Sequence, residues 1–147
     1  MKISLPKHLW LALCLMLSCK EEPININCAD PLGTDTKTLK DGVFSCFQEE
    51  FNSCVWFHLD VNPPVLQSVI VVKGNAVAYI FDVGEVECLS KVTIKPSSGW
   101  VYVTTAKLHH GYVIKMEDGT YGRLYIDSWE ISGSLVSEVN IKRQYAY

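Results

Sequence analysis

Short runs of β-branched and aromatic residues dominate the chain from Asp41 onward, and turn residues interrupt them. The interruptions recur roughly every eight to twelve residues, which is typical of a small antiparallel barrel or sandwich. No window shows a sustained helical period, and at most residues 85–91 make a helical turn or two. We therefore expect an all-β fold, with strands at residues 55–60, 65–72, 76–83, 100–105, 112–117, 120–126 and 136–145.

Asp118-Gly119 lies between two of these runs and predicts a β-hairpin. A two-residue loop would place Met116 opposite Tyr121 and Tyr112 opposite Tyr125. One face would then carry aromatic side chains and an arginine, namely Tyr112, Ile114, Met116, Tyr121, Arg123 and Tyr125. Tyrosine and arginine offer a large contact area with polar ends, so this face could be a recognition surface. The alternative is that its apolar members belong to the core and Arg123 lies along the rim.

Trp129 follows Asp127-Ser128 and so stands at the edge of a loop. If exposed, its ring could stack on a sugar; if buried, it would pack against the end of the β domain. The pattern favours core positions for Trp56 and Trp100. The candidate ligand-binding residues are therefore Tyr112, Tyr121, Arg123, Tyr125 and Trp129.

The start of the chain is a positively charged stretch followed by an apolar run at residues 9–17 and by Ser18-Cys19. This order is that of a secretory signal, and the run is shorter than the roughly 20 residues of a membrane-spanning helix. Ser18-Cys19 resembles the bacterial lipobox, in which the cysteine is acylated and the chain is cut before it. We expect a lipoprotein signal peptide at residues 1–18, a lipid anchor at Cys19 with a flexible tether to residue 40, and a single β domain at residues 41–147.

Lys20-Glu21-Glu22 resembles the signal that exports lipoproteins to the cell surface in the Bacteroidota. A solvated charged linker is the alternative for these residues, and a secreted protein with a spare thiol is the alternative for Cys19. We expect a protein that is lipid-anchored in the outer membrane and faces outward.

Without Lys2 and Lys7 of the signal, 11 basic residues remain against 16 acidic ones, a formal charge of −5. Such a domain is a poor partner for nucleic acid, which requires clustered lysine and arginine. The four cysteines Cys28, Cys46, Cys54 and Cys88 predict two disulfides outside the cytoplasm, with three possible pairings. Zinc, with His58, His109 or His110 as further ligands, is the alternative, although the cysteine spacing does not match that of structural zinc sites.

The second half of the chain contains a series of short motifs, namely Asp82-Val83-Gly84-Glu85-Val86, Pro96, Gly99-Trp100, His110-Gly111-Tyr112-Val113, Tyr121, Arg123-Leu124-Tyr125-Ile126, Ile141-Lys142 and Gln144. In their order and spacing these motifs resemble a family of Bacteroidota surface lipoproteins whose β domain has no assigned function. The resemblance covers about residues 74–147 and implies a surface lipoprotein with a small β domain, without any catalytic residue to transfer. The chain departs from the family at its end, where Ala146-Tyr147 stands in place of Pro-Phe.

No nucleophile with its base, paired acids or phosphate-binding glycine loop can be recognised in the sequence, so we expect neither enzymatic activity nor a cofactor. His109 and His110 are adjacent, so in an extended strand they point to opposite faces and do not readily share a metal. The leading interpretation is a non-catalytic binding or accessory module for a glycan or an envelope protein. The alternatives are a structural envelope protein without a small ligand and a minor hydrolase.

Overall fold

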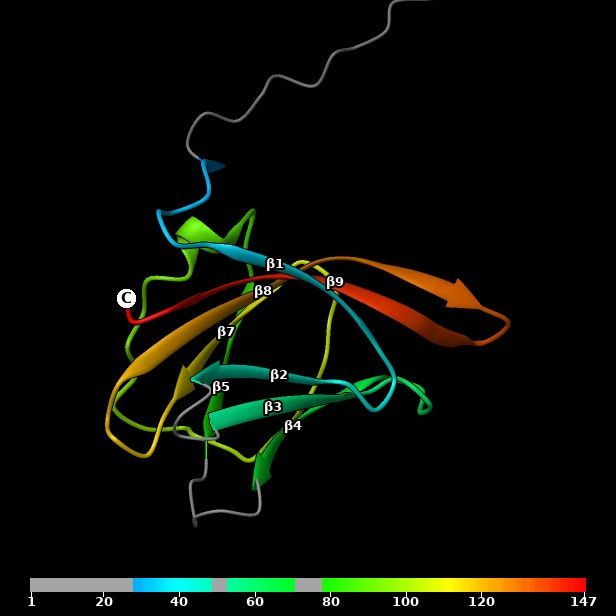
Figure 1. Ribbon diagram of the computed structural model, residues 1–147, viewed down its shortest axis with the longest axis horizontal. Helices are drawn as coiled ribbons and strands as arrows, with labels where there is room; N and C mark the ends of the chain where they lie inside the picture. Colours follow the sequence, from blue (N-terminus) through cyan, green and yellow to red (C-terminus); the bar gives the residue numbers. More distant parts are fainter. Residues whose placement is uncertain (1–27, 49–52, 71–77) are drawn as a thin grey trace, which may run out of the picture.

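The structure is a computed structural model, and it describes residues 28–48, 53–70 and 78–147. Within these residues nine β-strands form two antiparallel sheets, so the predicted all-β fold is confirmed (Figure 1). The same ranges contain no helix with the length and apolar character needed to cross a membrane. The expected signal peptide and Cys19 lie outside the described residues, as does the stretch between the expected strands at residues 65–72 and 76–83. The strands are β1 Asp35–Lys40, β2 Phe44–Gln48, β3 Ser53–His58, β4 Val65–Ile70, β5 Tyr79–Glu85, β6 Val103–Thr105, β7 His110–Lys115, β8 Tyr121–Ser132 and β9 Leu135–Tyr145.

The larger sheet has the strand order β1-β9-β8-β7-β5, and the smaller one has the order β2-β3-β4-β6. They face each other as a sandwich, with β2, β3 and β4 lying below β8 and β9 in the view of Figure 1. At one side Ile80 of β5 exchanges two backbone hydrogen bonds with Val101, which stands just before β6 of the smaller sheet. At the other side the chain turns directly from β1 into β2 at Gly42, whose φ of +76° is a conformation that glycine adopts readily.

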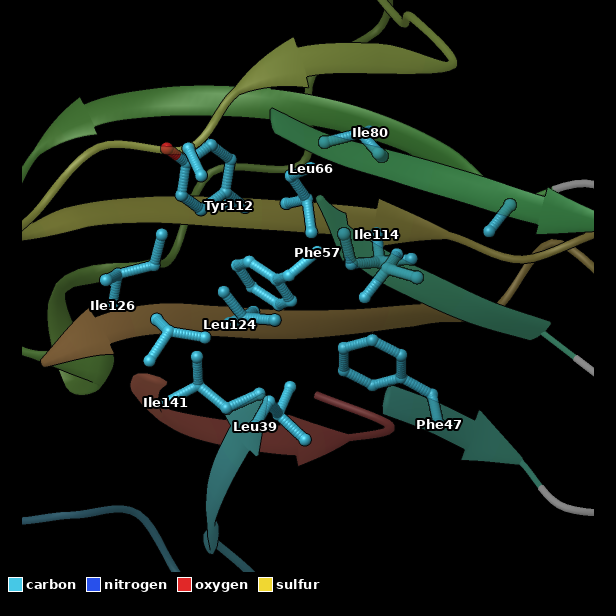
Figure 2. Packing of buried hydrophobic residues seen from close by; sticks show 14 of the residues in the cluster. Leu39, Phe47, Phe57, Leu66, Ile80, Tyr112, Ile114, Leu124, Ile126 and Ile141 are labelled. Carbon is cyan, nitrogen blue, oxygen red and sulfur yellow. The ribbon is translucent and has the colours of Figure 1, made fainter. Parts of the chain in front are cut away.

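The core lies between the sheets and consists mainly of alternate, inward-facing residues of the strands other than β6 (Figure 2). The smaller sheet contributes Phe57 and Leu66, and the larger sheet contributes Tyr112, Leu124 and Ile141, all with no exposed surface. Burial of such side chains stabilises a fold by about 1.5–3 kcal/mol each. This core accounts for the period-two pattern that predicted the strands.

Two disulfides are present, as predicted, and their pairing is Cys28–Cys88 and Cys46–Cys54. Cys46 and Cys54 are opposite each other in the register of β2 and β3. The other disulfide links the segment before β1 to the residue that precedes η3, a short 3-10 helix at Leu89–Lys91. The zinc alternative required free cysteine thiolates, and these four sulfurs are bonded to one another.

The predicted extent of the tether is wrong at its C-terminal end. Residues 35–40 form β1 and pair with β9 from Asp35 opposite Arg143 to Lys40 opposite Glu138. β1 is an edge strand in which only Leu39 is buried, so its sequence lacks the apolar alternation that marks the inner strands. The ordered domain therefore begins before Asp41.

The hairpin at Asp118-Gly119 exists, but its predicted register is wrong by one residue. The Met116 N–H donates to the Thr120 carbonyl at 2.9 Å and the Gly119 N–H donates to the Met116 carbonyl at 3.0 Å, so the loop has three residues, 117–119. Gly119 takes a φ of +82°, as the last residue of such a loop commonly does. A slip of one residue moves one strand's side chains to the opposite face of the sheet. Tyr121, Arg123 and Tyr125 consequently lie on the face opposite to Tyr112, Ile114 and Met116.

Candidate functional site

The outer face of the larger sheet, which points away from the sandwich core, carries a second cluster of apolar and aromatic side chains. Residues 86–100, here called the covering segment, cross this face and include η3. The buried members of the cluster are Leu89, Val92, Val113 and Tyr125, and the half-buried ones are Phe81, Val83, Val86, Trp100, Tyr121 and Tyr147. Two regions beside the covering segment remain accessible to solvent.

Arg123 of β8 connects the sheet to the covering segment through hydrogen bonds, and its side chain is only 8% exposed. Its Nη1 donates to the carbonyls of Leu89 at 3.4 Å and Val92 at 3.1 Å, and its Nε donates to Gln144 Oε1 at 2.8 Å. Burial lowers the pKa of Arg123, but an arginine keeps its charge at any physiological pH. Arg123 therefore positions the covering segment, and its burial prevents broad contact with a ligand.

The first accessible region is the outer aromatic patch, defined as Trp100, Tyr121 and Tyr147 with Lys95 and Lys115. The ring centroids of Trp100 and Tyr121 are 6.0 Å apart. Lys95 Nζ lies 5.4 Å from the centroid of Tyr121 and 5.0 Å from that of Tyr147, and Lys115 Nζ lies 5.9 Å from that of Trp100. All three rings are half-buried, so each is held in place and still reaches solvent.

The rings of the outer aromatic patch are fixed from several directions. Tyr121 begins β8, and Trp100 packs edge-on against Phe81 at 6.0 Å between centroids. Tyr147 donates its hydroxyl hydrogen to the Ile94 carbonyl at 3.0 Å, and burial raises the pKa of Tyr147 to about 12. The patch is therefore preorganised, because its side chains need little further ordering to receive a ligand.

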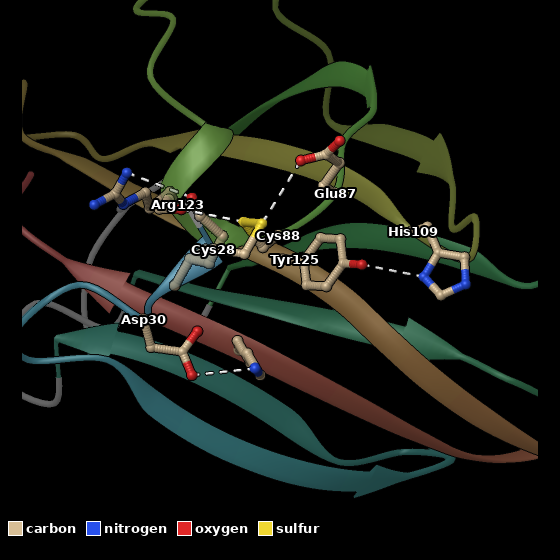
Figure 3. Close-up of a disulfide and its surroundings, with 10 residues drawn as sticks. Cys28, Asp30, Glu87, Cys88, His109, Arg123 and Tyr125 are labelled. Carbon is tan, nitrogen blue, oxygen red and sulfur yellow. Dashed lines mark hydrogen bonds and ion pairs between the residues drawn. A yellow bond between two sulfur atoms is a disulfide. The ribbon is translucent and has the colours of Figure 1, made fainter. Parts of the chain in front are cut away.

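The second accessible region is a hollow of about 470 Å³ lined by Glu85, Val86, Glu87, His109 and Tyr125. His109 Nδ1 and the Tyr125 hydroxyl are 3.1 Å apart, next to the Cys28–Cys88 disulfide (Figure 3). Burial raises the pKa of Tyr125, and the nearby Asp127 charge adds to the effect. Glu85 and Glu87 are both exposed, so the hollow is acidic and open to water.

The adjacent histidines have separate partners, but the extended placement expected for both is wrong for His109, which lies in the turn before β7 with a φ of +59°. His109 contacts Tyr125, whereas His110 Nδ1 lies 2.8 Å from Asp82 Oδ1. Burial raises the pKa of Asp82, but the hydrogen bonds from His110 and the Gly84 N–H outweigh it and hold the pKa below its ordinary value. In the part of the chain that the structure describes, no three His, Cys, Asp or Glu side chains are grouped to hold a metal.

The structure brings together three of the five predicted ligand-binding residues. Tyr121, Arg123 and Tyr125 share the outer face, whereas Tyr112 is fully buried in the core. Trp129 is opposite Val139 and packs against the same core, away from the outer aromatic patch. Their separation has two causes. The three-residue loop places Tyr121, Arg123 and Tyr125 on the face opposite to Tyr112, and the irregularity at residue 127 returns Trp129 to the core face.

Sequence reasoning missed Trp100, Tyr147, Lys95 and Lys115 as neighbours of Tyr121. The pairing of Lys115 opposite Tyr121 could have been predicted from the sequence, because a three-residue loop at residues 117–119 produces it. The other contacts join segments that lie far apart in the sequence, and no local pattern reports them.

No protein-family model, no curated protein and no solved structure matches this chain. The resemblance to Bacteroidota surface lipoproteins stays a prediction from the sequence. The functional interpretation therefore rests on the chemistry of the outer aromatic patch and of the acidic hollow.

Proposed function

We propose that this protein is a non-catalytic carbohydrate-binding module of a bacterial surface lipoprotein, anchored in the outer membrane through Cys19. The observation that carries the proposal is the outer aromatic patch, where Trp100, Tyr121 and Tyr147 stand together on the outer face of a rigid sheet. A tyrosine or tryptophan ring offers a flat apolar face to the C–H groups of a sugar, and its polar edge remains available for hydrogen bonds.

The arrangement of the outer aromatic patch also suits a repeating ligand. The Trp100 and Tyr121 rings are inclined by 35° to each other, so they form a shallow platform with a bend. The Lys95 ammonium lies between the Tyr121 and Tyr147 rings and can donate up to three hydrogen bonds. An extended chain of sugars would therefore meet apolar faces and hydrogen-bond donors in turn.

A hydrolase is the second candidate, and the acidic hollow at Glu85 and Glu87 is the observation that favours it. Glycoside hydrolysis uses a pair of carboxyl groups, one kept protonated and one ionised. Both glutamates here are exposed, so their environments are alike rather than opposed. Binding without turnover is therefore the function that we propose.

The proposal is tested by affinity electrophoresis of the purified chain through gels containing neutral or acidic soluble polysaccharides. We expect at least one polymer to retard the protein, and Tyr121→Ala to weaken that binding by at least about tenfold, the loss typical of a central aromatic contact. Tyr102→Ala is the matched control, because Tyr102 is 51% exposed and lies outside the patch. Equal losses in both variants, or no retardation by any polymer, would refute the proposal.

Turnover is measured on the same polymers by following new reducing ends. We expect none with the wild-type chain. Release of reducing ends that Glu85→Gln or Glu87→Gln abolishes would establish the hydrolase instead.

A further inference from the structure

We propose that the outer aromatic patch recognises an acidic polysaccharide, one whose sugars carry carboxylate or sulfate groups. This inference rests on the proposed carbohydrate-binding function and adds the class of ligand. It comes from the charges that surround the rings rather than from the rings themselves.

Lys95 and Lys115 stand beside the rings, and neither has a carboxylate partner among the described residues. No ion pair within the described residues includes either of them, whereas four other lysines are paired, namely Lys37, Lys40, Lys107 and Lys142. The chain as a whole is acidic, with 16 acidic residues against 13 basic ones. A surface with unneutralised lysines on an acidic protein is suited to an anionic ligand.

The two ammonium groups lie where the anionic groups of a stacked sugar would come. Each is within about 6 Å of a ring centroid, the range of a cation–π interaction. Such contacts hold a lysine near the ring without neutralising its charge. When a sugar stacks on the ring, the long flexible lysine side chain can move its ammonium group from the ring to a carboxylate or sulfate of that sugar.

Arg123 adds a third positive charge directly beneath the outer aromatic patch. Its guanidinium carbon is 4.7 Å from the centroid of Tyr147, and its hydrogen bonds go to carbonyl groups rather than to a carboxylate. A buried charge is screened less by water and salt than an exposed one. The patch therefore combines three aromatic rings with two accessible cations, and the buried charge of Arg123 adds to the positive potential beneath them.

Two matched pairs of polymers test this inference with the purified chain. Polygalacturonate is compared with its methyl ester, and dextran sulfate with dextran, by titration at low and at moderate salt. We expect the acidic member of at least one pair to bind at least about tenfold more tightly at low salt, and this advantage to shrink as salt screens the charges. If only polygalacturonate binds more tightly than its neutral partner, carboxylate is the recognised group. If only dextran sulfate binds more tightly than its neutral partner, sulfate is the recognised group.

Lysine variants separate the charge effect from stacking. We expect Lys95→Gln or Lys115→Gln to weaken binding of the acidic polymer roughly two- to fivefold each, as for an exposed ion pair, without changing binding of the neutral polymer. Lys40→Gln is the matched control, since Lys40 pairs with Glu138 on another part of the molecule and should leave both affinities unchanged. Thermal melting checks that every variant is folded.

Several results would overturn the inference. If neutral and acidic members bind equally and Tyr121→Ala abolishes both, the proposed function stands and the acidic class is wrong. If no polysaccharide binds, both the function and the inference are wrong. If oligodeoxythymidine binds as tightly as the acidic polysaccharide, the patch recognises polyanions in general and the inference is wrong.

Discussion

Replacing Tyr112 with phenylalanine tests the assignment of this residue to the core rather than to the ligand-binding surface. The Tyr112 hydroxyl accepts a hydrogen bond from the Lys107 N–H at 2.9 Å and donates one to the Thr105 carbonyl at 3.1 Å, and the side chain has no exposed surface. The ring itself survives in Tyr112→Phe, so the change removes two hydrogen bonds and little else. Burial also raises the pKa of Tyr112, so the hydroxyl is neutral throughout the accessible pH range.

The magnitude follows from those two bonds. Each net hydrogen bond stabilises a protein by about 0.5–1.5 kcal/mol, so the free energy of unfolding should fall by about 2 kcal/mol. For a domain of this size, that corresponds to a decrease in Tm of roughly 8 °C. Thermal melting followed by circular dichroism measures the effect, and the affinity for a polysaccharide should not change.

Tyr121→Phe is the matched control, because it is the same chemical change at a half-exposed tyrosine whose hydroxyl makes no hydrogen bond within the described residues. Its Tm should change little, as is usual for surface substitutions. If Tyr112→Phe melts within about 2 °C of the wild-type protein, a shift worth well under 1 kcal/mol, the hydroxyl is not buried as described and the register of the hairpin is in error.

Three further predictions concern stability. Gly122→Ala should lower the free energy of unfolding by about 1–3 kcal/mol, because the alanine Cβ would lie 2.6 Å from Phe47 Cδ1 and 2.9 Å from Met116 Cε and overpack the core. Urea unfolding measures the change, and an unchanged midpoint would contradict this packing. Replacing both Cys28 and Cys88 with serine should lower the free energy of unfolding by roughly 4 kcal/mol, and replacing both Cys46 and Cys54 by roughly 3 kcal/mol, because the first disulfide closes the longer loop. A larger loss in the second variant would contradict this loop-entropy explanation. Asp82→Asn should lower Tm near pH 7 and make Tm depend less on pH under acidic conditions. The pKa of Asp82 in the folded protein is below its ordinary value, so the ionised carboxylate stabilises the fold above about pH 4, and this stability is lost as the pH falls through the folded pKa. Parallel pH profiles for variant and wild type would refute that linkage.

Much of the fold could be predicted from the sequence because the inner strands alternate clearly. Tyr112 and Ile114 in β7 and Leu124 and Ile126 in β8 all face the core, and their spacing predicts strands without further information. β1 could not be predicted in the same way. It lies at the edge of the sheet and buries only Leu39, so burial imposes no alternation on it.

The candidate site could be predicted only in part, and the reason lies in the hairpin. Asp118-Gly119 is compatible with loops of two or three residues, and both faces of β7 and β8 are apolar. The hydrophobic pattern therefore did not select one register, although register decides whether Arg123 lies with Tyr112 or opposite to it. The contacts of Lys95 with Tyr121 and Tyr147 depend on the path of the covering segment, which no periodicity reports.

The most direct test of carbohydrate binding at the outer aromatic patch is the fluorescence of Trp100 during a titration with soluble polysaccharides. Phenylalanine at Trp10, Trp56 and Trp129 leaves Trp100 as the one tryptophan of the chain, and none of the three belongs to the patch. We predict saturable quenching of Trp100 that Tyr121→Ala weakens at least about tenfold, as expected for a neighbouring aromatic contact. A Trp100 signal that stays constant while the same protein binds a polysaccharide would place the site elsewhere and contradict the proposal.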